Sequence, residues 1–258
     1  MTGNRKANVV LQARDRKLLA ELGTMRLLDR ELAKVVAGFG SNTRANTRLL
    51  LLTRAGLLNR FFVGTIAAGQ KAIYTLSAKG AELSNADFGG IKRKSGALVV
   101  GDRFVDHQMQ INHVYVAVKF MPLPASIVFR RWISFHQPIA ENVQLVPDGY
   151  VELTSAQIVR PMFLEVDLGT EALKVWDGKI KTYLQLAISG KFAERFGQQQ
   201  FRVLVIANSA RRLKFLQKTV SKQTEKIFWL ASIEDINREG LWSAIWLRPK
   251  GDQPLSLI

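Results

Sequence analysis

The sequence predicts a mixed α/β (α+β) protein in two parts, a small basic part followed by a larger part with a mixed central sheet. Positive charge is concentrated in residues 1–100, which hold 17 Lys and Arg against 6 Asp and Glu, whereas residues 101–258 hold 20 against 15. Helical periodicity followed by a hairpin pattern fills the first hundred residues. Short strand-like runs alternate with helical segments in the remainder, which is typical of a sheet covered by helices.

The overall composition favours a polyanion as partner. The chain of 258 residues carries a formal net charge of +16, and phosphate neutralisation with counterion release dominates non-specific affinity for nucleic acid. The absence of Cys excludes a disulfide scaffold, a thiol nucleophile and Cys-bound zinc. No apolar run approaches the roughly 18 residues of a membrane span, so we expect a cytoplasmic protein with no membrane partner. A merely basic surface, or an anionic membrane surface, is the alternative to nucleic acid.

Three amphipathic helices are predicted within residues 1–84. The first is expected to stop at Gly23, because glycine is frequent just after a helix. Asp29 is placed to cap the second helix, which ends at Gly38, and Ser41 opens the third. The predicted buried positions of the first helix are Val10, Leu11, Leu18, Leu19 and Leu22; those of the second are Leu32, Val35 and Val36; those of the third are Ala45, Leu49 and Leu52.

The opposite face of the third helix carries small polar residues and arginines but no carboxylate. Such a face suits a helix that lies against phosphates and base edges in a major groove. After it, residues 57–63 and 71–76 read as two strands of a hairpin. Three helices and then a hairpin is the order of a winged helix-turn-helix, whose wing would touch backbone phosphates. The predicted DNA-binding residues are Thr43, Arg44, Thr47, Arg48, Arg54 and, in the wing, Lys71.

A small helical domain whose arginines only solvate its surface is the alternative for residues 1–84. Residues 85–100 combine turn-forming residues with the basic run Lys92-Arg93-Lys94 and are predicted to be a linker. The second domain then covers residues 101–258. Its predicted elements are a helix over residues 103–119, strands at 127–133, 144–153, 162–168, 203–207 and 227–231, and helices at 171–189 and 209–220.

Three carboxylates converge on one predicted hairpin of this second domain. Asp148 follows a proline in one strand, and Glu165 and Asp167 lie two residues apart in the next, so both project from one face. Buried carboxylates are costly unless a cation accompanies them. Clustered carboxylates suit Mg²⁺ or Mn²⁺, which neutralises charge on a phosphodiester under attack. A lysine of the following helix, Lys179 or Lys181, is placed to support that step.

An ordinary structural role is the alternative for these carboxylates. Glu165 and Asp167 would then pair with Arg or Lys, or cap the turn at residues 169–170. From the residues alone, the two interpretations stay open.

Four short segments follow the basic N-terminal part in a fixed order. They are Asp106-His107-Gln108-Met109-Gln110-Ile111-Asn112-His113-Val114-Tyr115, Pro147-Asp148, Phe163-Leu164-Glu165-Val166-Asp167-Leu168-Gly169-Thr170-Glu171 and Lys179-Ile180-Lys181-Thr182-Tyr183. In this order they resemble the replication-relaxation family, which includes plasmid mobilisation relaxases related to restriction endonucleases. The resemblance covers nearly the whole chain.

The resemblance implies a PD-(D/E)xK nuclease-like domain and metal-dependent nicking of one strand at a transfer or replication origin. It makes Asp148 and Glu165 metal ligands. The sequence departs from the pattern at Asp167, which stands where the family's lysine is expected. If the lysine of the pattern has moved to the following helix, Lys179 is the first candidate to replace it, because it lies four residues before Tyr183, as the lysine of the family does. Lys181 is the second candidate.

These observations lead to two hypotheses about function. The first is a relaxase-like nickase that uses Mg²⁺ or Mn²⁺ at Asp148, Glu165 and Asp167. Its expected partners are double-stranded DNA, single-stranded DNA at the nick, mobilisation or replication proteins and a second copy of the chain. The second hypothesis is a non-catalytic DNA-binding regulator whose nuclease-like domain serves dimerisation or partner contacts.

Overall fold

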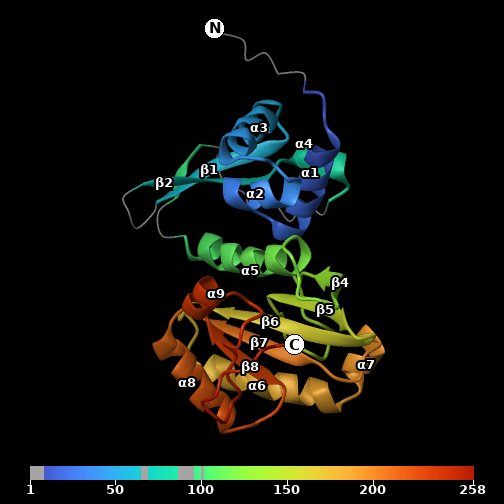
Figure 1. The fold of residues 1–258 in the computed structure, drawn as a ribbon, viewed down its shortest axis with the longest axis vertical. Helices are drawn as coiled ribbons and strands as arrows, with labels where there is room; N and C mark the ends of the chain where they lie inside the picture. The colour runs from blue at the N-terminus through green and yellow to red at the C-terminus, as the bar shows by residue number, and fades with distance from the viewer. Residues whose placement is uncertain (1–8, 65–68, 87–95, 100–101) are drawn as a thin grey trace. The chain divides into compact units, whose positions relative to one another are not determined.

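The computed structural model describes residues 9–64, 69–86, 96–99 and 102–258. It divides the chain into two compact units, Met1–Met121 and Pro122–Ile258 (Figure 1). The first unit contains α1 (Ala13–Met25), α2 (Arg30–Ala37), α3 (Asn42–Arg54), β1 (Leu58–Gly64), β2 (Gln70–Leu76), α4 (Ala78–Ser84), β3 (Leu98–Val99) and α5 (Arg103–Lys119).

The capping residues predicted for the second and third helices are confirmed. The Asp29 side chain accepts a hydrogen bond from the Leu32 amide at 2.8 Å, and α2 ends at Gly38 with a left-handed backbone. Ser41 accepts a bond from the Arg44 amide at 3.2 Å and opens α3. The predicted stop at Gly23 is wrong, since α1 continues to Met25. A Cβ at Gly23 would lie 2.6 Å from the Cβ of Ala86, so this glycine provides close packing instead.

A small sheet follows the three helices. β1 and β2 form an antiparallel hairpin paired from Leu58↔Leu76 to Gly64↔Gln70. Leu28, between α1 and α2, forms an antiparallel bridge with Tyr74 of β2. β3 pairs in parallel with the other side of β1, so part of the predicted linker is a strand. The basic run at residues 92–94 lies outside the described residues.

Helix α5 belongs to the first unit, whereas the sequence analysis assigned it to the second domain. The Asn112 side chain donates hydrogen bonds to the carbonyls of Met25 at 3.0 Å and Leu27 at 2.7 Å. Lys119 forms an ion pair with Glu21 of α1 at 2.8 Å. These polar contacts hold α5 to the end of α1, and a pattern of apolar residues does not reveal them.

The second unit contains the predicted mixed sheet, with strand order β4-β5-β6-β7-β8. The first two pairings are antiparallel, and β6, β7 and β8 are parallel to one another. Its elements are β4 (Ile127–Ile133), β5 (Gly149–Ser155), β6 (Ile158–Asp167), α6 (Leu173–Ile188), α7 (Lys191–Phe196), β7 (Arg202–Ala207), α8 (Ala210–Ser221), β8 (Phe228–Ser232) and α9 (Ile233–Glu239).

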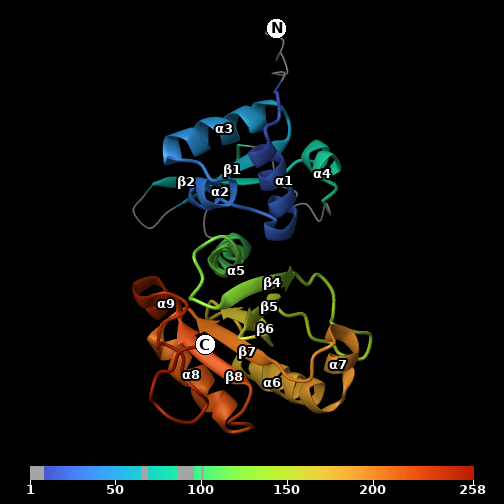
Figure 2. The same ribbon diagram turned by 45° about the vertical axis from the view of Figure 1, so that its right-hand side comes forward.

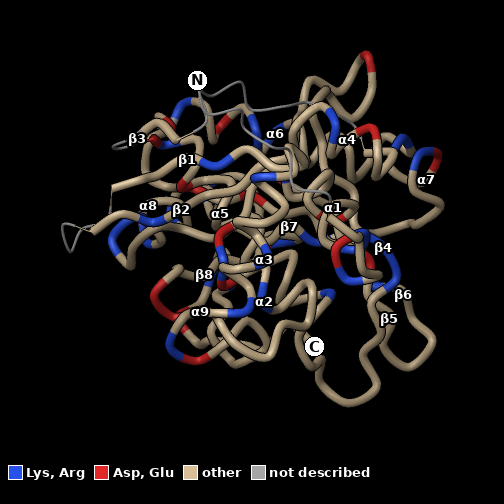
Figure 3. The backbone as a smooth tube through the Cα atoms, turned by 90° about the horizontal axis from the view of Figure 1, so that it is seen from above, with Lys and Arg blue, Asp and Glu red and all other residues tan. Residues whose placement is uncertain are grey.

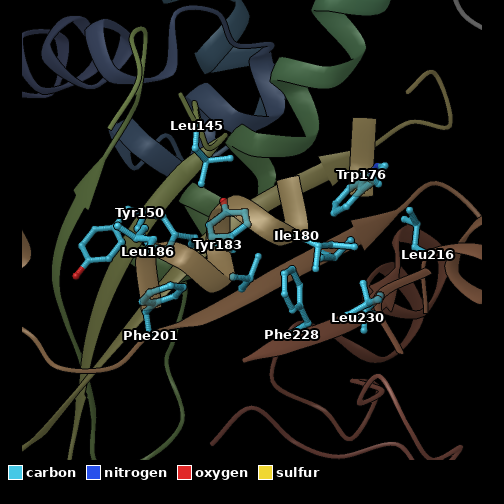
Figure 4. Close-up of a cluster of buried hydrophobic side chains, with 14 of the residues drawn as sticks. Leu145, Tyr150, Trp176, Ile180, Tyr183, Leu186, Phe201, Leu216, Phe228 and Leu230 are labelled. Carbon is cyan, nitrogen blue, oxygen red and sulfur yellow. The ribbon is translucent and has the colours of Figure 1, made fainter. Parts of the chain in front are cut away.

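Helices α6 and α8 lie side by side on one face of this sheet (Figures 1 and 2). Figure 4 shows the apolar side chains that fill the space between them and the strands, including Tyr150, Trp176, Tyr183 and Phe228. Strand β5 begins at Gly149, five residues later than predicted, so Asp148 lies just outside it. No helix in the described ranges is long and apolar enough to cross a membrane.

Candidate functional site

The three predicted carboxylates lie at one end of the β5–β6 pair. Gly149 is opposite Leu164 in the antiparallel register, which places Asp148 beside the later part of β6. One Asp148 oxygen accepts a hydrogen bond from the Val166 amide at 2.7 Å. Glu165 and Asp167 are both buried, with exposed fractions of 1% and 2%. Their two-residue spacing places them on the same face of β6, as predicted.

Glu165 is held by two residues of α6. The Lys179 Nζ donates to Glu165 Oε2 at 2.9 Å, and the Tyr183 hydroxyl donates to Oε1 at 2.6 Å. Lys179 also reaches Glu171 at 3.0 Å. The two α6 residues are four positions apart, and this spacing puts them on one face of a helix. The structure therefore brings together Asp148, Glu165 and Lys179, the first of the two candidate lysines.

Burial and opposing charges set the protonation of this group. Burial raises the pKa of Glu165 to about 7, because Lys179 only partly offsets the desolvation and the Asp148 charge adds to it. Burial lowers the pKa of Lys179, but Glu165 and Glu171 raise it by more, so it stays above its ordinary value. Burial and the neighbouring Glu165 raise the pKa of Tyr183 well above its ordinary value. Lys179 is therefore a cation, and Tyr183 is a neutral donor.

Asp167 is bound by a different set of donors from Glu165. The Arg212 guanidinium of α8 binds both its oxygens, at 3.0 and 2.8 Å. The Trp176 indole and the Gly169 amide also donate to it, each at 2.5 Å. Burial raises the pKa of Asp167, but the hydrogen bonds from Arg212 and Trp176 lower it by more. The pKa of Asp167 therefore lies below its ordinary value. Asp167 therefore pairs with an arginine and accepts a bond from the turn, as the alternative interpretation of these carboxylates expected.

A metal site built from all three carboxylates does not fit this arrangement. Within the described ranges, no group of three Asp, Glu or His side chains is placed to hold a metal ion. Asp148 and Glu165 remain as a pair of hard oxygen ligands. Magnesium is commonly held by one or two carboxylates together with waters and substrate phosphates. The pair fits that smaller donor set, since each carboxylate oxygen has more than one lone pair.

Lys181 does not join the network. It lies on α6 two residues from Lys179, but its side chain is exposed. Successive residues of a helix point about 100° apart, so Lys179 and Lys181 project in very different directions. Only one of the two candidate lysines can face the sheet.

A further buried carboxylate on the same sheet, bound by two side chains, was missed in the sequence analysis. Glu152 of β5 is 2% exposed and is bound by Arg131 at 2.6 Å and by the Tyr150 hydroxyl at 2.7 Å. Arg131 also donates to the Phe196 carbonyl at 3.1 Å. The alternation of Tyr150 and Glu152 in a strand was the available signal, because both must point to the same buried face.

In the first unit, most of the predicted DNA-binding face of α3 is open. Thr43, Arg44, Thr47 and Arg54 are exposed. A hollow of about 290 Å³ lies along this face. A second hollow, of about 530 Å³, lies between α2, α3 and the hairpin. The first is lined by Arg14, Phe39, Thr43, Arg44, Thr47, Arg48 and Leu51, and the second by Arg30, Glu31, Asn46, Phe62, Gln70, Lys71 and Ala72.

Two of the predicted DNA-binding residues are already engaged inside the unit. Arg48 binds both oxygens of Asp15, which is fully buried, and donates to the Val10 carbonyl at 2.8 Å. Lys71 forms an ion pair with the buried capping residue Asp29. Sequence periodicity places these cations on the surface but does not show that a distant carboxylate binds them. Arg48 therefore has a structural role, and Lys71 has one as well.

Helix α8 carries an additional group of Lys and Arg residues in the second unit, coloured blue in Figure 3. Its exposed side is free of carboxylates, and Phe215 lies among its cations with 46% of its surface exposed. Arg212 near the start of the helix binds Asp167, so this surface begins beside the carboxylates of β6. We call it the α8 basic face, and its residues are Arg211, Lys214, Phe215, Lys218 and Lys222.

Comparisons with known proteins assign the family. No curated protein matches the sequence. One solved structure with some likeness is that of the restriction endonuclease FokI, with 11% identity and a TM-score of 0.33 over 88% of this chain and 43% of that one. The chain thus spans less than half of the FokI length. The model of the replication-relaxation family matches residues 19–200. This chain therefore belongs to the replication-relaxation family.

Proposed function

We propose that the protein binds DNA through its first unit and nicks one strand with its second, as a metal-dependent relaxase at a plasmid or mobile-element transfer or replication origin. The observation that carries this proposal is the contact between Lys179 and Glu165 at 2.9 Å, beside Asp148. This contact brings a lysine of α6 to the carboxylates, whereas the strand itself has Asp167 at the position where the nuclease pattern has its lysine. Membership of the replication-relaxation family supports a role on DNA.

The first unit suits a winged helix-turn-helix. Three helices are followed by an antiparallel hairpin, and the bridge from Leu28 to β2 adds a third strand position between the first two helices. In this proposal α3 lies in the major groove and presents Thr43, Arg44 and Thr47 to the DNA. Its exposed arginines, Arg44 and Arg54, contact phosphates or base edges, while Arg48 stays paired with Asp15. The hairpin lies beside the duplex as a wing.

In the second unit, Asp148 and Glu165 would hold Mg²⁺ or Mn²⁺. When bound, the ion would neutralise charge on the scissile phosphodiester and lower the pKa of a bound water. Lys179 orients Glu165 through the ion pair and places a positive charge next to it. Tyr183 fixes the other Glu165 oxygen from the buried side. The α8 basic face provides a path for a DNA backbone toward the same end of the sheet.

The test is nicking of a supercoiled plasmid that carries DNA from the protein's own locus, with Mg²⁺ or Mn²⁺. Wild type is compared with Glu165→Gln, Asp148→Asn and Lys179→Ala. Lys181→Ala is the matched control, because it removes the same charge from the same helix at an exposed position. We expect open-circle product from wild type and the control, and a loss of product of at least about a hundredfold in the others.

A contradicting result would be equal nicking by wild type and Lys179→Ala, or no nicking with either metal. Absence of nicking together with tight, salt-sensitive DNA binding would favour a second candidate, a non-catalytic regulator. The engagement of Asp167 by Arg212 and Trp176 favours that candidate, since the usual lysine position is then purely structural. In such a regulator, the nuclease-like unit would serve dimerisation or partner contacts.

A further inference from the structure

Arginines gather on the sheet face opposite α6 and α8. Phe163, Val203 and Phe228 of the three parallel strands point into the helix-covered core. Side chains alternate along a strand, so Arg160, Arg202 and Trp229 of the same strands point the other way. The register places Met162 beside Arg202, and Leu204 beside Trp229.

A fourth side chain joins this group from the C-terminal segment. Leu247 pairs with Leu230 of β8, which brings the next residue, Arg248, to the same region. The Arg202 guanidinium carbon lies 4.5 Å from the Trp229 ring centre, and that of Arg248 lies 4.7 Å from it. The three arginines and Trp229 are each partly exposed. We call Arg160, Arg202 and Arg248 the arginine cluster.

No carboxylate balances the arginine cluster within the described ranges. Arg202 donates to the Leu257 carbonyl, and Arg248 donates to the Glu225 carbonyl at 2.9 Å. The Arg160 Nε is buried and has no hydrogen-bond partner in the described part of the chain. A buried donor without a partner is uncommon in folded proteins and calls for an explanation.

The cluster also carries an electrostatic cost. Burial lowers the pKa of Arg202, and the charges of Arg160 and Arg248 lower it further. Burial lowers the pKa of Arg248 as well. Stacking on Trp229 offsets part of this cost for two of the arginines. It does not account for Arg160, whose charge adds repulsion and whose Nε has no partner among the described residues.

We propose that the arginine cluster is a binding site for a phosphate group. A planar guanidinium donates paired hydrogen bonds that match phosphate oxygens, and three of them supply both the charge and the free donors. The phosphate belongs either to a nucleic-acid strand or to a free phosphate or nucleotide. This site lies on the sheet face away from Glu165 and needs no cleavage activity, so it stands or falls independently of the proposed nicking.

The experiment measures binding to the full-length chain by titration calorimetry at constant ionic strength. The probes are inorganic phosphate and a dT12 oligonucleotide without a terminal phosphate. Wild type is compared with Arg160→Gln and Arg248→Gln. Arg195→Gln is the matched control, because it removes the same charge from an exposed position of α7. Thermal melting establishes that each variant folds, and Arg160→Gln breaks no side-chain hydrogen bond of its Nε.

We expect phosphate affinity to fall about tenfold in Arg160→Gln and Arg248→Gln, which corresponds to about 1.4 kcal/mol, and to be unchanged in Arg195→Gln. Competition between dT12 and phosphate, with both weakened by the substitutions, would assign the site to a nucleic-acid strand. Phosphate binding that dT12 does not displace would assign it to a free phosphate or nucleotide. Equal phosphate affinity in wild type and Arg160→Gln, or no phosphate binding by wild type, would overturn the proposal.

Discussion

Glu165 and Asp167 are neighbours on one strand, but their cationic partners give them different properties. Lys179 binds Glu165 through one ammonium group, and 22% of the Lys179 side chain is exposed. Arg212 binds Asp167 through a planar guanidinium that contacts both oxygens. An ammonium is a compact charge that can move with its long side chain, whereas a bidentate arginine fixes geometry. Asp167 is therefore fixed at both oxygens by one charged guanidinium, whereas Glu165 meets its cation through a single ammonium group.

The Asp167 network leads to a prediction about stability. Arg212→Met should lower the free energy of unfolding by about 3–5 kcal/mol at pH 7, because it leaves a buried carboxylate without its cation. Chemical denaturation followed by circular dichroism measures this loss. Arg211→Met, on the exposed side of the same helix, should change stability by less than about 0.5 kcal/mol. Equal effects of the two substitutions would contradict the structural role of Arg212.

The same substitution has a predictable pH dependence. The pKa of Asp167 is lower in the folded state than in the unfolded state. Its contribution to stability is therefore present above the ordinary Asp pKa and is lost as the pH falls through the folded-state pKa. Without Arg212, burial raises the pKa of Asp167 in the variant, so the difference between wild type and Arg212→Met should shrink as the pH falls from 7 to below about 4. A difference that stays constant from pH 7 to pH 3 would argue against an ionised Asp167.

Two arginines of α3 should behave differently. Arg44→Ala removes an exposed side chain and should weaken DNA binding by about 1–3 kcal/mol if it contacts a base, without changing stability. Arg48→Ala should destabilise the first unit by about 3–5 kcal/mol, because Asp15 would be left buried and unpaired. Thermal melting and DNA titration of both variants separate these outcomes. An unchanged melting temperature in Arg48→Ala would show that its pairing with Asp15 is unimportant.

Among the helices and strands, the ends of an element were predictable from sequence where the capping residue bonds to residues close to it in the chain. Asp29, Gly38 and Ser41 act through bonds to residues three or four positions away, so both ends of α2 and the start of α3 were predictable. Gly23 was not, because its role depends on contact with Ala86, far along the chain. The short elements α4, α7 and α9 have too few residues for a clear periodicity.

The lysines of helix α8 are expected to contribute to DNA binding. Lys214→Gln with Lys218→Gln should weaken DNA binding and reduce its dependence on salt, because each lost phosphate contact lowers the slope of log K against log[salt] by roughly 0.9. Filter binding at several salt concentrations measures the slope. Lys191→Gln at the start of α7 is the control. The same slope in the double variant and wild type would remove the α8 basic face from the DNA-binding surface.

For the whole molecule, the division of the chain yields a prediction about fragments. A fragment of residues 1–121 should fold cooperatively, whereas one of residues 1–101 should not, because it lacks α5 and the bonds of Asn112 to the end of α1. Circular dichroism melts of the two fragments test this. A cooperative transition in the shorter fragment would restore the boundary expected from composition.

The sequence alone predicted a mixed sheet and the shared face of Glu165 and Asp167, because strand alternation is a local rule. It also ranked Lys179 above Lys181. It did not predict the order of the strands within the sheet. It did not predict that Asp167 binds Arg212, which is 45 residues away, or that Arg48 binds Asp15, which is 33 residues away. Such pairings depend on how distant elements meet, and neither periodicity nor charge counting contains that information.

The ion pairs of the sheet also bear on how its strands find their alignment. Glu152, Glu165 and Asp167 receive their cations from β4, α6 and α8, so each carboxylate is matched with a different element. A slip of one residue along β6 would turn Glu165 and Asp167 to the opposite face, away from Lys179 and Arg212. Apolar strand residues alone tolerate such a slip more readily. The buried ion pairs therefore favour one alignment of the strands during folding, the one in which Glu152, Glu165 and Asp167 each meet a cation.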